Sequence, residues 1–393
     1  MRKDSFVSPD YFALDKLLTE ENLLIRDVTR EWVKNNVSPV IESAVQNDKF
    51  PMEFIKGLAE IGGFGPFLPE KYGGAGVDYI SYGLMMQELE RGDSSLRVLS
   101  SIQSGLVMKL IYQYADEKQK DKYLLSLSNG DNVGSFGMSE PNHGSDPSSM
   151  LTRFDDHGDY YLINGSKLWI GQAPICDLAL FWARNHSDEF ALFLVERGFE
   201  GFETSKIKNK WGFRGSETGE LIFNNLKLQK ENLLFKTKNI QEMLSCLNIG
   251  RYAVAWGALG IAMDCYDCAL KYSTERIQFG KKIASYQLVQ KKLSDMITEI
   301  TKIQILVWRL GKLMNESQAT FEQISLAKRS SVSMASEVAI IARSILGGMG
   351  VTAEYPVMRH ILNLEVLKTY QGTEEIHTLI TGKSITGISA FRS

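Results

Sequence analysis

Five short motifs carry the side chains in this chain that are best suited to chemistry. Aromatic rings can wall a planar ligand, hydroxyls and backbone N–H groups can donate to its edge, and a guanidinium can bind phosphate bidentately. In chain order the motifs are residues 136–146 (FGMSEPNHGSD), 167–170 (KLWI), 276–280 (RIQFG), 346–350 (LGGMG) and 370–377 (YQGTEEIH). Each motif alone is a weak signal, but their order and spacing together are informative.

Helical segments must hold most of these motifs in place. Apolar residues recur at helical spacing in both the first and the last third of the chain. The predicted helices cover residues 18–37, 80–90, 101–114, 286–314, 321–346 and 360–369. Long helices with short connections in the last third favour a bundle.

The middle of the chain has the composition of strands. Residues 178–183, 190–195 and 220–228 are predicted strands, and Asn164-Gly165 between two apolar runs predicts a β-hairpin. The sequence therefore predicts an α+β fold that is mainly α. Its parts are an N-terminal helical domain (1–130), a middle antiparallel β-domain (131–240) and a C-terminal four-helix bundle (241–393).

Bulk composition excludes some classes of partner. The net charge of -3 gives no electrostatic reason to expect nucleic acid or an anionic membrane surface. The apolar stretch 253–263 is too short to cross a bilayer, which needs about 20 residues. Residues 1–10 lack the apolar core of a signal peptide, so a cytoplasmic location is expected.

Two of the four cysteines form a C-x-x-C pair. Cys265 and Cys268 lie inside an apolar helical run, without a second such pair or a nearby pair of histidines. Buried core thiols are therefore the favoured interpretation over a redox or metal site, and no metal is expected.

In this order and at these distances, the five motifs resemble those of the FAD-dependent acyl-CoA dehydrogenases. The resemblance extends over about residues 16–391. It implies FAD as cofactor and an acyl-CoA or acyl-carrier thioester as substrate. It also implies a homotetramer, with an electron-transfer flavoprotein as the electron acceptor if there is turnover.

The resemblance also implies cofactor contacts for particular residues. Those facing the isoalloxazine are Phe136, Met138, Ser139, Trp169 and Gly171, with Thr373 and Glu375 completing the contacts. Arg276 would reach the pyrophosphate of a neighbouring subunit's FAD, with Phe279 and Gln287 nearby. Gly347 and Gly348 would approach the adenosine part. Trp169 as a plain core residue, and the glycines as a helix C-cap, stay open as alternatives.

On the substrate side, the resemblance places Ser145 and Arg251 near the acyl-CoA. Residues 90–97 (ERGDSSLR) are similar to the segment of glutaryl-CoA dehydrogenases in which an arginine binds the distal carboxylate. Arg97 falls on that position, and Glu90 and Ser101 are its companions. A carboxylate at the end of an apolar pocket needs such a partner. A structural Arg97 paired with Glu90 or Asp93, and a salt-bridged Arg251, remain the alternatives.

Two departures from the family pattern affect the reacting face. Gln371 stands where the family keeps its catalytic glutamate, and an amide cannot accept the α-proton. A few relatives carry the base at the position that corresponds to Gly250, and a glycine offers no carboxylate there either. Gly171 replaces the Thr or Ser that donates to flavin N5.

Three hypotheses follow from these departures. The chain is a flavoenzyme with altered chemistry, such as decarboxylation, isomerisation or cyclisation of an acyl thioester. Alternatively, it is a catalytically silent paralogue that binds FAD and acyl-CoA. In the third hypothesis, it is a Glu-to-Gln mutant of an ordinary glutaryl-type dehydrogenase.

Overall fold

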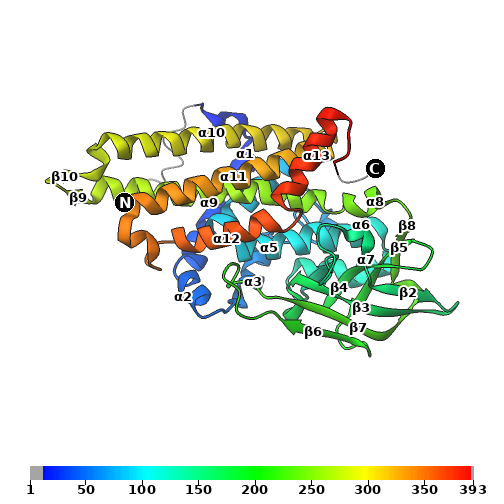
Figure 1. Ribbon diagram of the computed structural model, residues 1–393. Helices are drawn as coiled ribbons and strands as arrows, with labels where there is room; N and C mark the ends of the chain where they lie inside the picture. The colour runs from blue at the N-terminus through cyan, green and yellow to red at the C-terminus, as the bar shows by residue number, and fades with distance from the viewer. Residues whose placement is uncertain (1–11, 391–393) are drawn as a thin grey trace.

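The computed structural model describes residues 12–390 and divides into a helical body and a sheet at one end (Figure 1). The prediction about a signal peptide rests on residues 1–10, which lie outside the described residues. The N-terminal helices are α1 (Glu20–Trp32), α2 (Ile41–Gln46), α3 (Glu53–Glu60), α4 (Tyr79–Gly92), α5 (Ser94–Ser101), α6 (Lys109–Tyr114) and α7 (Glu117–Ser128). A π-helical segment, η5 (Ile102–Met108), joins α5 to α6.

The middle part is an eight-stranded sheet. Its strands are β1 (Gly134–Gly137), β2 (Arg153–Asp156), β3 (Tyr160–Gly171), β4 (Leu178–Arg184), β5 (Phe190–Glu196), β6 (Phe202–Lys206), β7 (Thr218–Gln229) and β8 (Leu233–Thr237). They lie in the order β6-β7-β3-β2-β4-β5-β8, with β1 paired to β4. The pairings are antiparallel, as predicted from the short connections, apart from the parallel β1–β4 and β2–β4 pairs.

The hairpin predicted at Asn164-Gly165 is wrong. β3 runs without a break through this dipeptide and pairs with β2 on one side and β7 on the other. The pairing register with β7 shifts between Ile163 and Gly165, so the dipeptide forms a bulge. Gly165 has φ of 140°, and a side chain there would meet the backbone of Thr152 at 2.6 Å, which explains the glycine.

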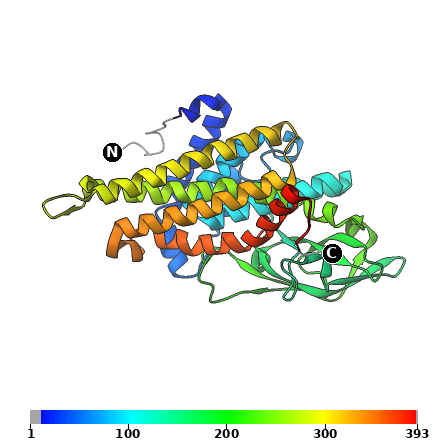
Figure 2. The same cartoon turned by 45° about the horizontal axis from the view of Figure 1, so that its top comes forward.

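The C-terminal helices form the predicted bundle. They are α8 (Ile240–Ser245), α9 (Asn248–Glu275), α10 (Gln287–Asn315), α11 (Phe321–Leu346), α12 (Val357–Thr369) and α13 (Glu374–Thr386). A small hairpin of β9 (Ile277–Gln278) and β10 (Lys281–Lys282) joins α9 to α10 and lies at the end of the bundle far from the large sheet (Figures 1 and 2). α9 is central, since it packs against α4, α10, α11 and α12.

Two bundle helices are long and apolar enough to pass a test for membrane spans by length and composition. In Ile240–Glu275, 78% of the most apolar window is buried inside the protein, and in Phe321–Val351 the share is 44%. The central place of Ile240–Glu275 in the bundle thus explains why this segment is so apolar. Cys265 is fully buried within it, and burial raises the pKa of both Cys265 and Cys268 well above the usual thiol range. A raised pKa disfavours the reactive thiolate, which supports the prediction of core thiols.

Candidate active site

Gln371 lies in the tight turn between α12 and α13. Gln371 has φ of 57° and Gly372 has φ of 94°, so two successive residues adopt left-handed backbone. Thr373 then caps α13, with its hydroxyl accepting a hydrogen bond from the N–H of Ile376 at 3.3 Å. The turn holds residue 371 in one defined direction.

The side chain of Gln371 lies against Gly250 of α9. A Cβ placed on Gly250 would lie 3.1 Å from Oε1 of Gln371. The two positions at which the family resemblance implies a base therefore converge on one spot, and neither carries a carboxylate. Oε1 of Gln371 is buried and has no hydrogen-bond partner within residues 12–390.

Basic side chains surround this turn. Arg251 donates from Nε to the carbonyl of Gln371 at 3.0 Å, and its guanidinium lies over the ring of Phe321 at 4.8 Å. Lys328 of α11 donates from Nζ to the carbonyl of Gly372 at 2.8 Å. Burial lowers the pKa of Arg251 to about 10, and burial together with the charge of Arg251 lowers that of Lys328 to about 7. In the described chain Arg251 pairs with no carboxylate, so the salt-bridge alternative for this residue loses its support.

Two acids, Glu374 and Glu375, directly follow the turn on the first turn of α13. Glu375 is exposed on the first turn of α13 and Glu374 is half-buried beside it. Their charges raise the pKa of Lys328, against the lowering by burial, so they lie toward that lysine. That neither acid replaces the missing base stays a prediction.

His377 of α13 closes the inner side of the turn. Its ring is fully buried, and a Cβ on Gly372 would lie 2.9 Å from its Nε2. Burial, and then the charges of Lys328 and Arg251, lower the pKa of His377 to about 3. The folded protein therefore keeps this imidazole neutral.

Acid should destabilise the fold through His377. The pKa is about 3 in the folded chain and about 6.5 in the unfolded one, so stability is fully present above pH 6.5 and is lost as the pH falls toward 3. We expect the free energy of unfolding, measured by urea titration, to fall by about 2 kcal/mol between pH 7 and pH 5 from this group. A His377→Gln variant should show a smaller fall. An equal fall in both proteins would show that other groups cause the acid sensitivity.

Arg97 occupies a buried site at the end of the helical core. Its guanidinium forms a two-point contact with Glu90, including Nη2 to Oε1 at 3.0 Å, and both side chains are fully buried. Nη1 makes a long contact of 3.4 Å with the hydroxyl of Ser101, and Nη2 also bonds the hydroxyl of Tyr370. Burial opposes the charge, but Glu90 and Tyr370 together hold the pKa of Arg97 above its usual value.

The structure thus brings Arg97, Glu90 and Ser101 together, as the resemblance implied. For the alternative of a structural Arg97, the structure narrows the two suggested partners to one, because Arg97 pairs with Glu90 whereas Asp93 pairs with Arg359. Tyr370 was not among the predicted site residues. Its place directly before Gln371 ties the Arg97 site to the turn at residues 370–372.

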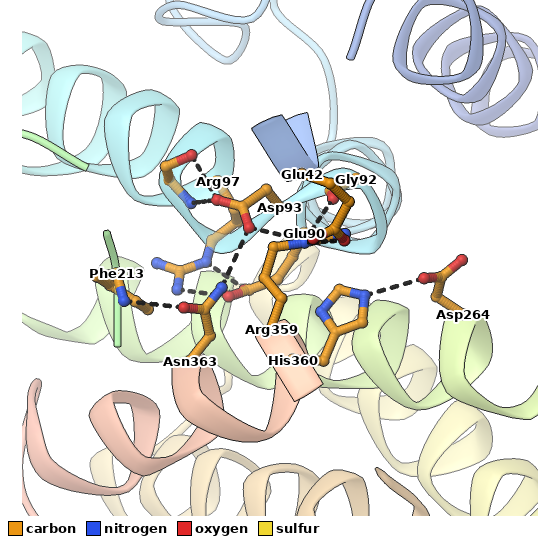
Figure 3. Close-up of polar contacts among 11 residues, drawn as sticks. Glu42, Glu90, Gly92, Asp93, Arg97, Phe213, Asp264, Arg359, His360 and Asn363 are labelled. Carbon is orange, nitrogen blue, oxygen red and sulfur yellow. Dashed lines mark hydrogen bonds and ion pairs between the residues drawn. The ribbon is translucent and has the colours of Figure 1, made fainter. Parts of the chain in front are cut away.

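A second buried ionic network supports this region (Figure 3). Asp93 binds Arg359 of α12 at 2.7 Å and accepts from the amide of Asn363 at 3.2 Å. Asn363 in turn accepts from the backbone N–H of Phe213 at 2.9 Å. The ring of Phe213 meets that of Tyr370 edge to face, with centroids 5.7 Å apart. Tyr370 is therefore held on one side by Arg97 and on the other by Phe213.

Gly257 of α9 is a further residue that sequence reasoning missed. A Cβ at this position would lie 1.8 Å from Oε2 of Glu90, so only glycine leaves room for that carboxylate. The glycine allows α9 and α4 to approach closely around the ion pair.

The end of strand β3 supplies an exposed aromatic ring. Trp169 sits at a register shift in β3, with φ of 65°, and 62% of its side chain is exposed. This exposure rules out the alternative of a core tryptophan. The loop with Met138 and Ser139 is fixed beside it, because the N–H of Leu168 donates to the carbonyl of Ser139 at 2.9 Å.

A buried ion pair fixes the same loop from below. Lys167 binds Glu140 at 2.8 Å and the carbonyl of Met138 at 3.3 Å. Phe136, in β1, is buried under the loop. An exposed ring beside a fixed loop with a half-buried hydroxyl, that of Ser139, fits the edge of an isoalloxazine.

The surface beside Gly171 is open except for one atom. A Cβ there would meet only Cδ1 of Ile102, at 2.6 Å, within the 4 Å around it. Ile102 directly follows Ser101, so it links the surface beside Gly171 to the Arg97 site. The open face agrees with a flavin placed against Gly171, and the terminal methyl of Ile102 fills the place of the missing hydroxyl side chain.

The closeness of Gly171 to Ile102 predicts that a larger residue at 171 destabilises the fold and that a smaller residue at 102 offsets this loss. Gly171→Thr alone should cost about 1–3 kcal/mol of unfolding free energy through overpacking. Combining it with Ile102→Val, which removes the contacting methyl, should recover part of that loss, and the double-mutant cycle should show this coupling. Additive effects of the two changes would contradict the contact. The midpoint potential of the bound flavin should also shift in the double variant, since a hydroxyl then faces it.

The other predicted cofactor residues lie at the opposite end of the bundle. Arg276 and Phe279 belong to the exposed β9–β10 hairpin, and 95% of the Phe279 side chain is exposed. Gln287 begins α10 at the same end, and Gly347 and Gly348 follow α11, which runs back toward that end (Figure 1). Open space surrounds both glycines. A single chain therefore does not bring these residues together with Trp169 and Gln371.

Ser145 is the remaining predicted substrate residue. It is exposed in the loop between β1 and β2. Its role stays a prediction.

Comparison with known proteins identifies the class to which this fold and site belong. Three family models match in order: the acyl-CoA dehydrogenase N-terminal domain over residues 19–131, the middle domain over 135–226 and the C-terminal domain over 240–386. The chain is 34% identical over 375 residues to an acyl-CoA dehydrogenase of Bacillus subtilis, covering 94% of this chain and 99% of that protein. The chain belongs to the acyl-CoA dehydrogenase family. FAD is the cofactor of this family.

Individual relatives are named after different acyl-CoA substrates. The human mitochondrial short-chain specific acyl-CoA dehydrogenase is 30% identical over 368 residues, covering 92% of this chain and 89% of that protein. A crystal structure of glutaryl-CoA dehydrogenase from Mycobacterium smegmatis is similar with a TM-score of 0.94 and 39% identity, over 98% of this chain and 99% of the other. A second structure of a glutaryl-CoA dehydrogenase from that organism, in complex with FADH2, has a TM-score of 0.95 and 38% identity, with the same coverage.

Proposed function

We propose that this flavoprotein acts on an acyl-CoA, or a carrier-bound acyl thioester, that carries an acidic group at its distal end. The observation that carries the proposal is the fully buried Arg97, which has a two-point partner in Glu90 and a weakly bound Nη1 beside Ser101. A buried guanidinium suits a ligand carboxylate. Likeness to glutaryl-CoA dehydrogenases supports the same substrate class.

We propose further that the reaction does not begin with removal of the α-proton by residue 371. The two candidate base positions, 371 and 250, hold an amide and a glycine in contact with one another. When bound, FAD supplies an acceptor for a hydride from the β-carbon, but that step requires a base for the α-proton. Decarboxylation of an unsaturated diacid thioester such as glutaconyl-CoA needs neither event.

The atoms of that decarboxylation balance without an oxidant. The bond between the distal carboxylate carbon and the γ-carbon breaks, and CO2 leaves. Its electron pair spreads through the double bond to the thioester carbonyl, and a proton from water is then added to give crotonyl-CoA. In this scheme Arg97 and Tyr370, which are bonded to each other, orient the carboxylate.

Release of CO2 tests this reaction. Holoprotein incubated anaerobically with glutaconyl-CoA should release one CO2 per thioester and form crotonyl-CoA while the flavin absorbance stays that of the oxidised cofactor. If no more CO2 forms than in a control without protein, decarboxylation is excluded as the reaction. Isomerisation or cyclisation of the acyl group would then be tested from the products by mass spectrometry.

A silent binding paralogue is the second candidate function. It is favoured by Ile102, whose terminal methyl occupies the place of a flavin-facing hydroxyl, in addition to the amide at position 371. Turnover of any acyl-CoA with a dye as electron acceptor would exclude it.

We propose a homotetramer as the working form. The support is the separation of the two sets of cofactor residues, since Arg276 and Phe279 are exposed at one end and Trp169 at the other. A second copy that brings its hairpin to Trp169 would complete the site. If the protein does oxidise a substrate, an electron-transfer flavoprotein is the proposed acceptor.

A further inference from the structure

The turn at residues 370–372 needs support from outside its own backbone. Gln371 is a non-glycine residue in left-handed conformation, and such residues persist where the surroundings fix them. The turn serves two sites at once, since Tyr370 bonds Arg97 and the side chain of Gln371 packs on Gly250. A small rotation of this turn would move both side chains.

Two basic groups from different helices hold the carbonyls of the turn. Arg251 of α9 bonds the carbonyl of Gln371 at 3.0 Å, and Lys328 of α11 bonds the carbonyl of Gly372 at 2.8 Å. Only 1% of Lys328 is exposed, and within residues 12–390 the Gly372 carbonyl is its one hydrogen-bond acceptor. Burying an ammonium without a carboxylate partner is costly, so this contact is retained against a substantial penalty.

The charges around Lys328 come from three directions. Arg251 on α9 and Arg97 on α5 oppose its positive charge, whereas Glu374 and Glu375 on the first turn of α13 favour it. His377 lies beside the same glycine and stays neutral. None of these groups satisfies the ammonium directly, which leaves the turn carbonyl as its specific ligand.

We infer that Lys328 is a positioning residue that locks the 370–372 turn through the carbonyl of Gly372, so that residue 371 and Tyr370 are presented together to the acyl thioester. This inference rests on the proposed function in placing residue 371 beside the reacting carbon. The lysine acts through the turn and not by contact with substrate. The turn that Lys328 holds thus couples the distal-acid site to the reaction centre, since Tyr370 of the same turn bonds Arg97.

Hydrogen exchange tests the lock without any substrate. In the FAD-loaded protein, Lys328→Met should speed amide exchange at least tenfold in peptides that cover residues 369–373. Exchange in the middle of α9 and in the large sheet should stay unchanged. Lys328→Arg, which keeps a cationic donor, should restore much of the protection, and Arg329→Met is the control for loss of a neighbouring charge. Unchanged exchange at residues 369–373 in Lys328→Met, or equal loosening throughout the bundle, would overturn the inference.

A kinetic readout separates this role from a general structural one. In a Gln371→Glu background, the Lys328→Met change should slow flavin bleaching by glutaryl-CoA about tenfold or more, with a much smaller change in the half-saturating thioester concentration. A rise in the half-saturating concentration with an unchanged limiting rate would contradict a role in presenting residue 371. If the Gln371→Glu protein itself does not respond to glutaryl-CoA, the proposed substrate fails, and the hydrogen-exchange result alone decides the role of Lys328.

Discussion

Replacing Gln371 by glutamate should start the oxidation of glutaryl-CoA. The new carboxylate would lie in the space beside Gly250, in a turn whose carbonyl binds the charged Arg251, and this guanidinium would keep it ionised at neutral pH. An ionised, desolvated carboxylate can accept the α-proton, and such general-base catalysis contributes roughly 10²–10⁴-fold. We therefore expect the flavin of Gln371→Glu to bleach under anaerobic conditions at least 100-fold faster than that of the unmodified protein.

Two variants control this experiment. Gln371→Asn keeps an amide and should give no gain. The double change Gly250→Glu with Gln371→Gly moves the carboxylate to α9, and it should restore part of the activity, since both positions reach the same spot. Bleaching of the unmodified protein as fast as the Gln371→Glu variant would show that another base exists.

Removing the charged pair at Arg97 should remove selectivity for diacid thioesters. Arg97→Met alone would leave Glu90 buried without a partner, a change that typically costs about 3–5 kcal/mol of stability. The informative protein is therefore Arg97→Met combined with Glu90→Gln, in which no charge is left unpaired. Its affinity for glutaryl-CoA should fall by about 2–5 kcal/mol, or roughly 30- to several thousand-fold.

The matched ligand is butyryl-CoA, which lacks the distal carboxylate. Titration of the holoprotein, followed by the shift in flavin absorbance, should give an affinity for butyryl-CoA within a few-fold of that of the unmodified protein. Equal loss for both thioesters would mean that Arg97 is a structural residue whose only task is to pair with Glu90.

Helices were predicted more accurately than strand connections, and the reason is physical. The amphipathic pattern predicted residues 321–346 as a helix, and α11 has those bounds, because Thr320 caps its start and Gly347 ends it. The Asn164-Gly165 dipeptide was predicted as a hairpin turn and is a bulge. Turn dipeptides favour left-handed or otherwise unusual backbone, and a bulge needs the same property. The sequence around the dipeptide does not tell whether the next apolar run folds back or continues.

Resemblance to a family predicted individual site residues that the pattern of helices does not reveal. Arg97, Glu90 and Ser101 do meet in the structure. The partners Tyr370 and Lys328 were missed, because their contacts join segments far apart in the chain, as with Arg97 and Tyr370, which are 273 positions apart. A lysine within the otherwise apolar and small-residue face of α11 was a signal that could have drawn attention to Lys328.

Deuterium uptake at the α-carbon is the most direct measurement of the central claim, which is that this site holds a glutaryl-type thioester without a base for its α-proton. Holoprotein would be incubated anaerobically with glutaryl-CoA in D2O, and the recovered thioester analysed by mass spectrometry beside the Gln371→Glu variant. We expect no deuterium from the unmodified protein above the solvent background, and clear incorporation or oxidation with the variant. Deuterium at the α-carbon after incubation with the unmodified protein would contradict the account, since a working base would then be present despite Gln371.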